Sequence, residues 1–237
     1  MKEKELPKAL AKRDWNNHAP LIYPGYKSTL IRNPTKPLIV VPEELAALDM
    51  PVYGDSAIGE FDHDLTRNAR INGEPIGERI VLSGKVMDEQ GRGLPNVLVE
   101  LWQANSAGRY VHRQEIHDAP LDPNFHGAGR TLTDSAGSYR FYTIKPAAYP
   151  WGNHHNAWRP AHIHLSLFGH HLGTRLVTQM YFPNDPLFAF DPIFNSIPAH
   201  ARHLLVSSFN LDMTEPGFAL GYEFNLVLRG KNQTPFE

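Results

Sequence analysis

His162 and His164 are separated by a single residue at the start of residues 162–168, where apolar and polar side chains alternate as they do in a strand. Residues two apart in a strand share a face, so both imidazoles point the same way while Ile163 points into the opposite layer. Two adjacent imidazoles can bind one metal ion. The alternative interpretation is that both histidines are structural residues on a half-buried strand.

The remaining ligands of such a metal would have to come from elsewhere in the chain. The chain has no cysteine, and no Asp or Glu lies between Asp134 and Asp185. The nearest side chain that can become an anion is a tyrosine, either Tyr149 or another of the nine in the chain. A free phenol has a pKa near ~10, but a strongly Lewis-acidic cation can deprotonate its ligand. Phenolate and imidazole together suit ferric iron better than zinc, calcium or magnesium.

The segments that must position these residues have strand character. About eight short strands follow residue 78, separated by Gly, Pro and Asp turns, at 79–87, 96–102, 130–133, 138–144, 162–168, 175–181, 203–211 and 221–229. This pattern predicts an all-β domain, an antiparallel β-sandwich over residues 78–237. Long insertions at 103–129 and 145–161 interrupt the sandwich, and functional sites usually lie on such loops.

Residues 1–77 are predicted to form an N-terminal arm that lies at a subunit interface or on the domain behind it. Short helices are expected at 42–48 and, more weakly, at 8–15. The arm is also too apolar for a disordered tail. Its eight prolines leave room only for such short helices: Pro7, Pro20, Pro24, Pro34, Pro37, Pro42, Pro51 and Pro75.

Composition narrows the class of protein. The chain has 237 residues, of which 41% are hydrophobic and 20% charged, and a net charge of −2. These values are ordinary for a globular protein and give no reason to expect nucleic acid or an anionic membrane surface as a partner. The first residues lack the apolar core of a signal peptide, and no apolar run approaches membrane-spanning length. A soluble cytoplasmic protein is therefore expected.

Several motifs in a fixed order resemble the intradiol ring-cleaving dioxygenases, which are non-haem ferric enzymes. The motifs are Leu82-Ser-Gly-Lys-Val-Met-Asp88, Val99-Glu-Leu-Trp-Gln-Ala-Asn-Ser-Ala-Gly-Arg-Tyr110, Thr133-Asp-Ser-Ala-Gly-Ser-Tyr-Arg-Phe141, Tyr149-Pro-Trp151, Arg159-Pro-Ala-His-Ile-His164 and Thr178-Gln-Met-Tyr-Phe182. The likeness covers roughly residues 78–230 and implies a prealbumin-like β-sandwich. The proline-rich arm, with Asp14-Trp15 and Tyr23-Pro24-Gly25-Tyr26, resembles the protocatechuate 3,4-dioxygenase branch, which pairs an α chain with an iron-holding β chain. Catechol and hydroxyquinol dioxygenases begin instead with a helical dimerisation domain.

The resemblance implies a site and a reaction. Its motifs place four ligands of non-haem Fe(III) on Tyr110, Tyr149, His162 and His164. They place an active-site arginine on Arg159, a supporting glutamine on Gln179, and pocket residues on Trp151 and Ile193. The implied reaction is intradiol cleavage of a catecholic acid by O2, protocatechuate to 3-carboxy-cis,cis-muconate, in a hetero-oligomer with an α chain. Cleavage of catechol or hydroxyquinol is the alternative within the family.

Two interpretations from other classes compete with this one. The first is a zinc or copper hydrolase or oxidase that uses His162 and His164 with a remote acid. The second is a non-catalytic β-sandwich binding module whose histidines are structural. Four further histidines, His154, His155, His170 and His171, have no assigned role, because adjacent side chains on an extended chain diverge.

Overall fold

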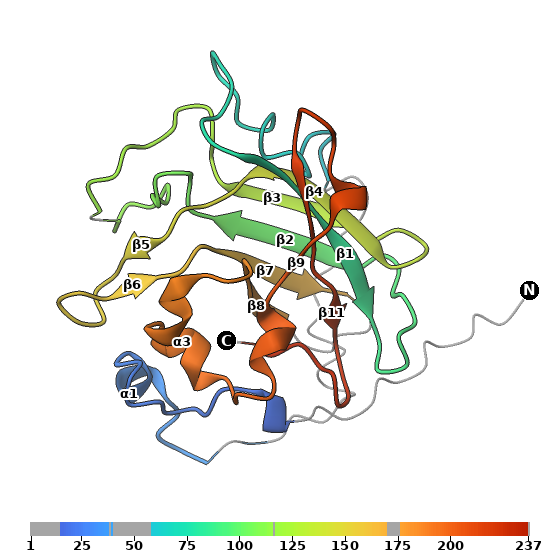
Figure 1. Ribbon diagram of the computed structural model, residues 1–237. Helices are drawn as coiled ribbons and strands as arrows, with labels where there is room; N and C mark the ends of the chain where they lie inside the picture. The colour runs from blue at the N-terminus through green and yellow to red at the C-terminus, as the bar shows by residue number, and fades with distance from the viewer. Residues whose placement is uncertain (1–14, 38, 40–57, 116, 170–175, 237) are drawn as a thin grey trace, which may run out of the picture.

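Two β-sheets packed face to face form the body of the protein (Figure 1). The computed structural model describes residues 15–37, 39, 58–115, 117–169 and 176–236. One sheet contains β1 (Arg79–Met87), β4 (Ser138–Ile144), β9 (Ser208–Phe209), β10 (Leu220–Glu223) and β11 (Leu226–Val227). The other contains, in spatial order, β3 (Ala128–Leu132), β2 (Leu98–Gln103), β7 (His162–Phe168) and β8 (Leu176–Tyr181). The predicted β-sandwich is confirmed.

The first sheet differs from the prediction in its pairing. β1 pairs antiparallel with β4 but parallel with β10 and β11, so this sheet is mixed. The second sheet is antiparallel throughout. Pairing direction depends on how the connecting loops bring distant strands together, and local periodicity carries no information about this.

The strand predicted at 203–211 is wrong. Residues Arg202–Leu205 form the 3-10 helix η4, and the following β9 is only two residues long before the 3-10 helix η5 (Leu211–Met213) begins. Leu205 is buried in a small cluster with Phe194, Ile197 and the aromatic ring of Tyr181. Packing in this cluster, rather than alternation across a sheet, determines the local structure.

The main core lies between the two sheets and explains the orientation of the histidines. Ile163 is completely buried in that core, together with Leu165 of the same strand and Phe141 of β4. Because side chains alternate along β7, His162 and His164 lie on the opposite, outer face of the sheet. The predicted division of these residues between the two faces is confirmed.

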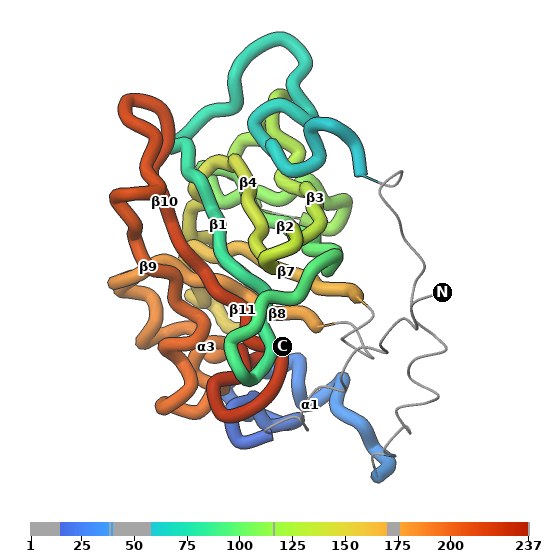
Figure 2. The backbone as a smooth tube through the Cα atoms, turned by 90° about the vertical axis from the view of Figure 1, so that its right-hand side faces the viewer, coloured from blue at the N-terminus to red at the C-terminus, as the bar shows by residue number. Residues whose placement is uncertain are grey.

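Short helices lie near one end of the sandwich, below β8 in Figure 1. They are η3 (Pro186–Ala189), α3 (Pro192–Ser196) and η4 from the 186–205 segment, with η1 (Trp15–Asn17) and α1 (Thr29–Arg32) from the arm. Figures 1 and 2 both show α1 beside α3. Residues distant in sequence therefore meet near the edge of the second sheet.

The arm is only partly within the described residues, and both predicted helices, at 8–15 and 42–48, fall largely or wholly outside them. Residues 58–77 lie against the sandwich, since Leu65 is completely buried in the core and the Asn124 side chain accepts hydrogen bonds from the backbone N–H groups of residues 71–73. The division of the chain at residue 77 stays a prediction. Among the helices that the structure describes, none is long and apolar enough to cross a membrane.

Candidate metal centre

Four aromatic rings meet on the outer face of the second sheet, and they are the four predicted metal ligands. Ring centroids are 4.9 Å apart for His162 and His164, and 5.4 Å apart for His162 and Tyr149. Tyr110 closes the cluster at 5.3 Å from Tyr149 and 6.3 Å from His164. The Tyr149 hydroxyl lies 3.4 Å from Nε2 of His162. Two phenols and two imidazoles thus form one cluster, and the polar atoms of Tyr149 and His162 lie close together within it.

The register of the sheet fixes the two histidines and their neighbours. His164 lies opposite Trp102 of β2 and Gln179 of β8, and His162 lies opposite Tyr181. Directly opposed residues share a face, so these side chains form two rows across the sheet. The Trp102 ring stacks on His164 at 4.8 Å with an interplanar angle of 4°, which restricts rotation of that imidazole.

A tight turn brings Tyr110 next to Tyr149. The Asn105 side chain accepts hydrogen bonds from the backbone N–H groups of Ala107 and Arg109, and Gly108 adopts a φ of +78°. A Cβ on Gly108 would lie 2.4 Å from the carbonyl oxygen of Ala148, so only glycine permits this approach of the two segments. Although Tyr110 is far from the histidines in sequence, the turn places it in the cluster.

Tyr149 is held more firmly than its loop position suggests. Tyr149–Pro150 forms β5, which pairs antiparallel with β6 (Trp158–Arg159). In that ladder Tyr149 lies opposite Arg159. The 145–161 insertion therefore contains its own two-stranded ladder, and the backbone of Tyr149 is part of it.

The protonation states suit metal ligation. The Pro160 carbonyl oxygen lies 2.7 Å from Nδ1 of His162 and accepts a hydrogen bond from its N–H, which leaves Nε2 as the basic nitrogen facing Tyr149. Burial, followed by the positive charge of Arg159, holds the pKa of His162 well below its usual value. Burial raises the pKa of Tyr149, although Arg159 and a hydrogen bond from Tyr110 oppose this. Without a metal, a neutral imidazole and a neutral phenol are expected.

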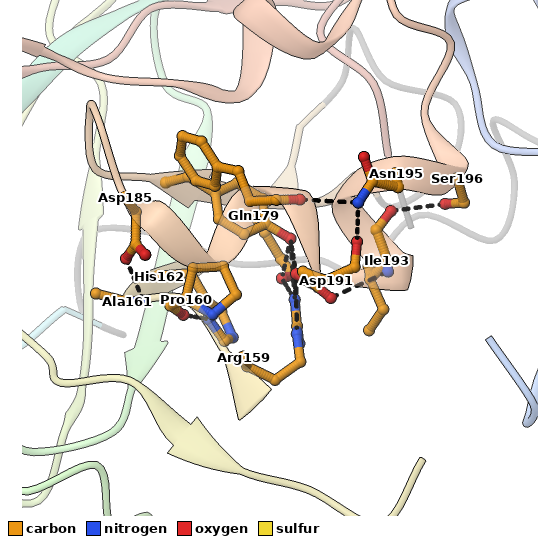
Figure 3. A network of polar contacts seen from close by, with 12 residues as sticks. Arg159, Pro160, Ala161, His162, Gln179, Asp185, Asp191, Ile193, Asn195 and Ser196 are labelled. Carbon is orange, nitrogen blue, oxygen red and sulfur yellow. Dashed lines mark hydrogen bonds and ion pairs between the residues drawn. The ribbon is translucent and has the colours of Figure 1, made fainter. Parts of the chain in front are cut away.

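Arg159 lies beside the cluster in a network of buried polar groups (Figure 3). Its guanidinium donates hydrogen bonds to the side-chain oxygens of Gln179 and Tyr181, and forms an ion pair with Asp191 at 3.2 Å. It also interacts with the Tyr149 hydroxyl. The structure thus places Arg159 and Gln179 together, next to a predicted ligand.

Asp191 was missed by the sequence reasoning. Its carboxylate is completely buried, and the residue is the N-cap of α3. The pattern Asp-Pro before a short helical segment indicates a capping residue. Nothing in the sequence around Asp191 pointed to Arg159, which is 32 residues away.

The two predicted pocket residues lie in different surroundings. Ile193 of α3 lines a cavity of about 440 Å³ together with Gln179, Tyr181 and Tyr26 of the arm. Trp151 is not among the residues that line this cavity, but its ring contacts that of Tyr26 at 5.5 Å and lies 5.7 Å below the Arg159 guanidinium. The arm therefore contributes to the surroundings of both residues.

The other histidines do not form a second site within the part of the chain that the structure describes. His154 and His155 are both exposed, and His170 and His171 lie outside the described residues. Among the described residues, no three His, Cys, Asp or Glu side chains come together as a metal site. A metal ion at His162 and His164 would therefore need ligands of another kind, and the phenols of Tyr110 and Tyr149 are the candidates.

Comparison with known proteins agrees with this arrangement of residues. Residues 48–230 match the dioxygenase family, and residues 11–44 match the N-terminal region of the protocatechuate 3,4-dioxygenase beta subunit. The chain is 61% identical to the protocatechuate 3,4-dioxygenase beta chain of Burkholderia cepacia, an alignment that covers 98% of this chain and 99% of that one. It is 29% identical to an alpha chain of that enzyme from Pseudomonas putida, covering 68% of this chain and 76% of that one.

A solved structure supports the fold independently. The 3-chlorocatechol 1,2-dioxygenase of Rhodococcus opacus superposes with a TM-score of 0.56 at 24% identity, covering 78% of this chain and 76% of that one. At this identity the likeness concerns the fold alone. Together with the family matches and the near-complete alignment above, it leads to one conclusion: the chain belongs to the intradiol ring-cleaving dioxygenases, a family that uses non-haem iron.

Proposed function

We propose that Tyr110, Tyr149, His162 and His164 bind one ferric ion in this chain. The observation that carries the proposal is the cluster of two phenols and two imidazoles with ring centroids 4.9–6.3 Å apart. This donor set, without thiolate and without a nearby carboxylate ligand, suits ferric iron. When bound, the ion supplies Lewis acidity and a template for the two oxygens of a catechol.

The protein groups around the cluster have complementary roles in this proposal. A catechol must lose protons to bind as a dianion, and in this proposal the Tyr149 phenolate accepts one of them. Arg159 carries the positive charge that stabilises negative charge developing on the substrate ring. Gln179 holds the guanidinium, while Trp151 and Ile193 provide apolar walls.

Protocatechuate is the proposed substrate, cleaved by O2 to 3-carboxy-cis,cis-muconate. The support is the name of the Burkholderia cepacia relative, which is 61% identical over nearly the whole chain. A catechol 1,2-dioxygenase of Acinetobacter baylyi is 35% identical but aligns with only 48% of this chain. Catechol and hydroxyquinol are therefore the less favoured substrates.

The proposed partner is an alpha chain, with residues 1–77 as an arm at the interface between the two chains. The match of residues 11–44 to a beta-subunit N-terminal region supports this role. Several described arm residues also expose large apolar side chains, including Ile31 at 88%. The expected cytoplasmic location stays a prediction.

The test is an assay of O2 uptake with protocatechuate and with catechol. The chain is expressed alone and together with an alpha chain, in medium containing iron, and the product is identified by chromatography against authentic muconates. We expect a coloured protein, since tyrosinate bound to Fe(III) absorbs visible light, and faster turnover of protocatechuate than of catechol. A folded but colourless and iron-free protein contradicts the metal assignment. Bound zinc or copper supports the competing hydrolase or oxidase.

A further inference from the structure

The Asp191 carboxylate makes contacts in two directions. Its Oδ2 atom accepts hydrogen bonds from both Nε and Nη2 of Arg159, each at 3.2 Å. Its Oδ1 atom accepts from the backbone N–H of Ile193 at 3.0 Å. One carboxylate therefore holds the guanidinium with one oxygen and the first turn of α3 with the other.

The opposite charges of Asp191 and Arg159 are both buried. The side chain of Asp191 is 0% exposed and that of Arg159 is 3% exposed, so water screens neither charge. A buried ion pair brings little net stability, but removing one partner leaves an uncompensated charge at high cost. Such a pair is better explained by the position that it imposes on its members than by stability.

Arg159 also contacts the side chains of Gln179, Tyr181 and Tyr149, but none of these is a carboxylate that could replace Asp191. Gln179 and Tyr181 accept hydrogen bonds from Nη2, and Tyr181 also donates to Gln179. These are neutral groups, and Nε of the guanidinium donates to Asp191. The plane of a guanidinium is fixed when donors on two of its nitrogens have acceptors. Asp191 accepts from both Nε and Nη2, so its carboxylate orients the guanidinium.

The same carboxylate connects Arg159 to the wall of the cavity. Ile193 is the second residue of α3 and lines the cavity that Gln179 also lines. Asn195 reinforces the start of this helix, because its backbone N–H and its side-chain amide both donate to the Asp191 carbonyl oxygen. The position of the helix and that of the guanidinium are therefore coupled through Asp191.

We propose that Asp191 is a positioning residue. It orients Arg159 toward the substrate, and it holds Ile193 at a fixed distance from the Arg159 guanidinium. The proposal rests on the proposed function for its catalytic consequence. The competing explanation is that Asp191 only caps α3.

Asp185 offers a control for capping alone. It precedes Pro186 as Asp191 precedes Pro192, and its side chain caps η3 by accepting from the backbone N–H of Leu187 at 2.9 Å. Its other oxygen accepts from the backbone N–H of Ala161 at 3.2 Å rather than from an arginine. Asp185→Asn thus makes the same chemical change at a similar cap that lacks the ion pair.

The first experiment compares Asp191→Asn with Asp185→Asn in the iron-loaded protein co-expressed with its alpha chain. Asparagine keeps an oxygen for the cap, but it loses the charge and presents N–H groups to the guanidinium. We expect Asp191→Asn to retain iron and colour while kcat falls by about 10²-fold, a typical effect of misplacing a catalytic group. Asp185→Asn is expected to change kcat much less. Equal effects of both variants overturn the proposal.

The second experiment is a double-mutant cycle with Arg159→Met, which removes the charge but keeps a long side chain. If Asp191 acts through Arg159, adding Asp191→Asn to Arg159→Met produces no further loss of kcat. Multiplicative losses overturn the proposal.

Thermal unfolding gives a readout that does not depend on activity. Asp191→Asn is expected to lower Tm in the wild-type background and to raise it in the Arg159→Met background, where it relieves an unpaired buried carboxylate. The same sign in both backgrounds overturns the ion-pair role. If the wild-type protein cleaves no catechol, the proposed function fails, whereas the change in sign still decides whether Asp191 holds Arg159.

Discussion

Burial and neighbouring charges shift the pKa values of single groups at the candidate metal centre. Burial raises the pKa of Tyr149, whereas the positive charge of Arg159 and the hydrogen bond from Tyr110 lower it. Burial and the same positive charge both lower the pKa of His162. Near neutral pH the metal-free site therefore holds protonated phenol and unprotonated imidazole, and a cation must displace the phenol proton in order to bind.

The first prediction is that ferric iron binds more tightly as pH rises from about 6 to 8. Each phenol that binds releases one proton, so the logarithm of the affinity should rise by about 2 per pH unit if both tyrosines bind. Chelator competition, corrected for the protonation of the chelator, measures this slope. Tyr149→Phe is the control and should reduce the slope by about one. An affinity that does not change with pH contradicts phenolate ligation.

The second prediction concerns the two tyrosines, which should not be equivalent. The resemblance to the family implies that one tyrosinate leaves the metal when substrate binds, and we expect this tyrosinate to be Tyr149. Because the backbone of Tyr149 is paired in β5, such a departure would require rotation of the side chain and not movement of a loop. Tyr149→Phe should still bind iron but bind substrate slowly, while Tyr110→Phe should mainly reduce iron content.

Metal analysis and stopped-flow spectra of the two variants with protocatechuate distinguish these outcomes. Tyr139→Phe is a useful comparison with these two variants, because Tyr139 lies in the core between the sheets, away from the candidate metal centre. Its hydroxyl donates a hydrogen bond to the Phe224 carbonyl oxygen. The substitution should affect stability and leave iron content unchanged. If Tyr110→Phe is the variant that retains iron and binds substrate slowly, the assignment of roles is reversed.

At the scale of elements, two insertions must meet for the site to form. The turn at residues 105–109 packs against residues 147–149, where the backbone N–H of Ala147 donates to the Asn105 carbonyl oxygen at 3.2 Å. The ladder of β5 and β6 then places Tyr149 beside Arg159. The sheet supplies the histidines, whereas the contact between insertions supplies the phenols.

The third prediction tests this contact with Gly108→Ala. The change combines a left-handed φ of +78° with a Cβ placed 2.4 Å from the Ala148 carbonyl oxygen. We expect the free energy of unfolding to fall by about 2–5 kcal/mol and iron content to fall with it. Urea unfolding of the metal-free protein and metal analysis are the measurements.

Gly217→Ala is the matched control for this variant. Gly217 also has a left-handed φ, +72°, but no other atom lies within 4 Å of the Cβ that would be added. Its substitution should cost only the conformational strain, about 1–2 kcal/mol, and leave iron content unchanged. Equal losses in the two variants would show that the close approach of the insertions is not required.

At the scale of the whole molecule, apolar surface remains uncovered in the described structure. Ile31 is 88% exposed and Leu30 is 55% exposed, both on α1 of the arm, and Ile71 and Ile76 are also exposed. Large apolar residues gathered on an exposed surface often mark an interface. The arm also carries the match to a beta-subunit N-terminal region.

The fourth prediction is that this chain forms a stable assembly with an alpha chain. Size-exclusion chromatography with light scattering should show a species containing both chains after co-expression. Replacing Leu30 and Ile31 by Asp should weaken that assembly without unfolding the chain, because both side chains are exposed. A soluble, fully active monomer of this chain alone would refute the prediction.

The sequence by itself determined the strands whose alternation is local. Strands 79–87, 138–144 and 162–168 agree with β1, β4 and β7 to the residue. The two faces of β7 followed from the same alternation, with Ile163 in the core and the histidines outside it. These features depend on side chains a few residues apart, which is why periodicity predicts them.

Only the tertiary structure decided which distant side chains meet. The sequence motifs named Tyr110, Tyr149 and Arg159 by resemblance, but their proximity depends on the close approach at Gly108 and on the β5–β6 ladder. The parallel pairing of β1 with β10 and the ion pair of Arg159 with Asp191 had no local pattern to reveal them. Such contacts arise from the packing of insertions around a rigid sandwich, because their energies depend on burial and geometry that exist only after the chain has folded.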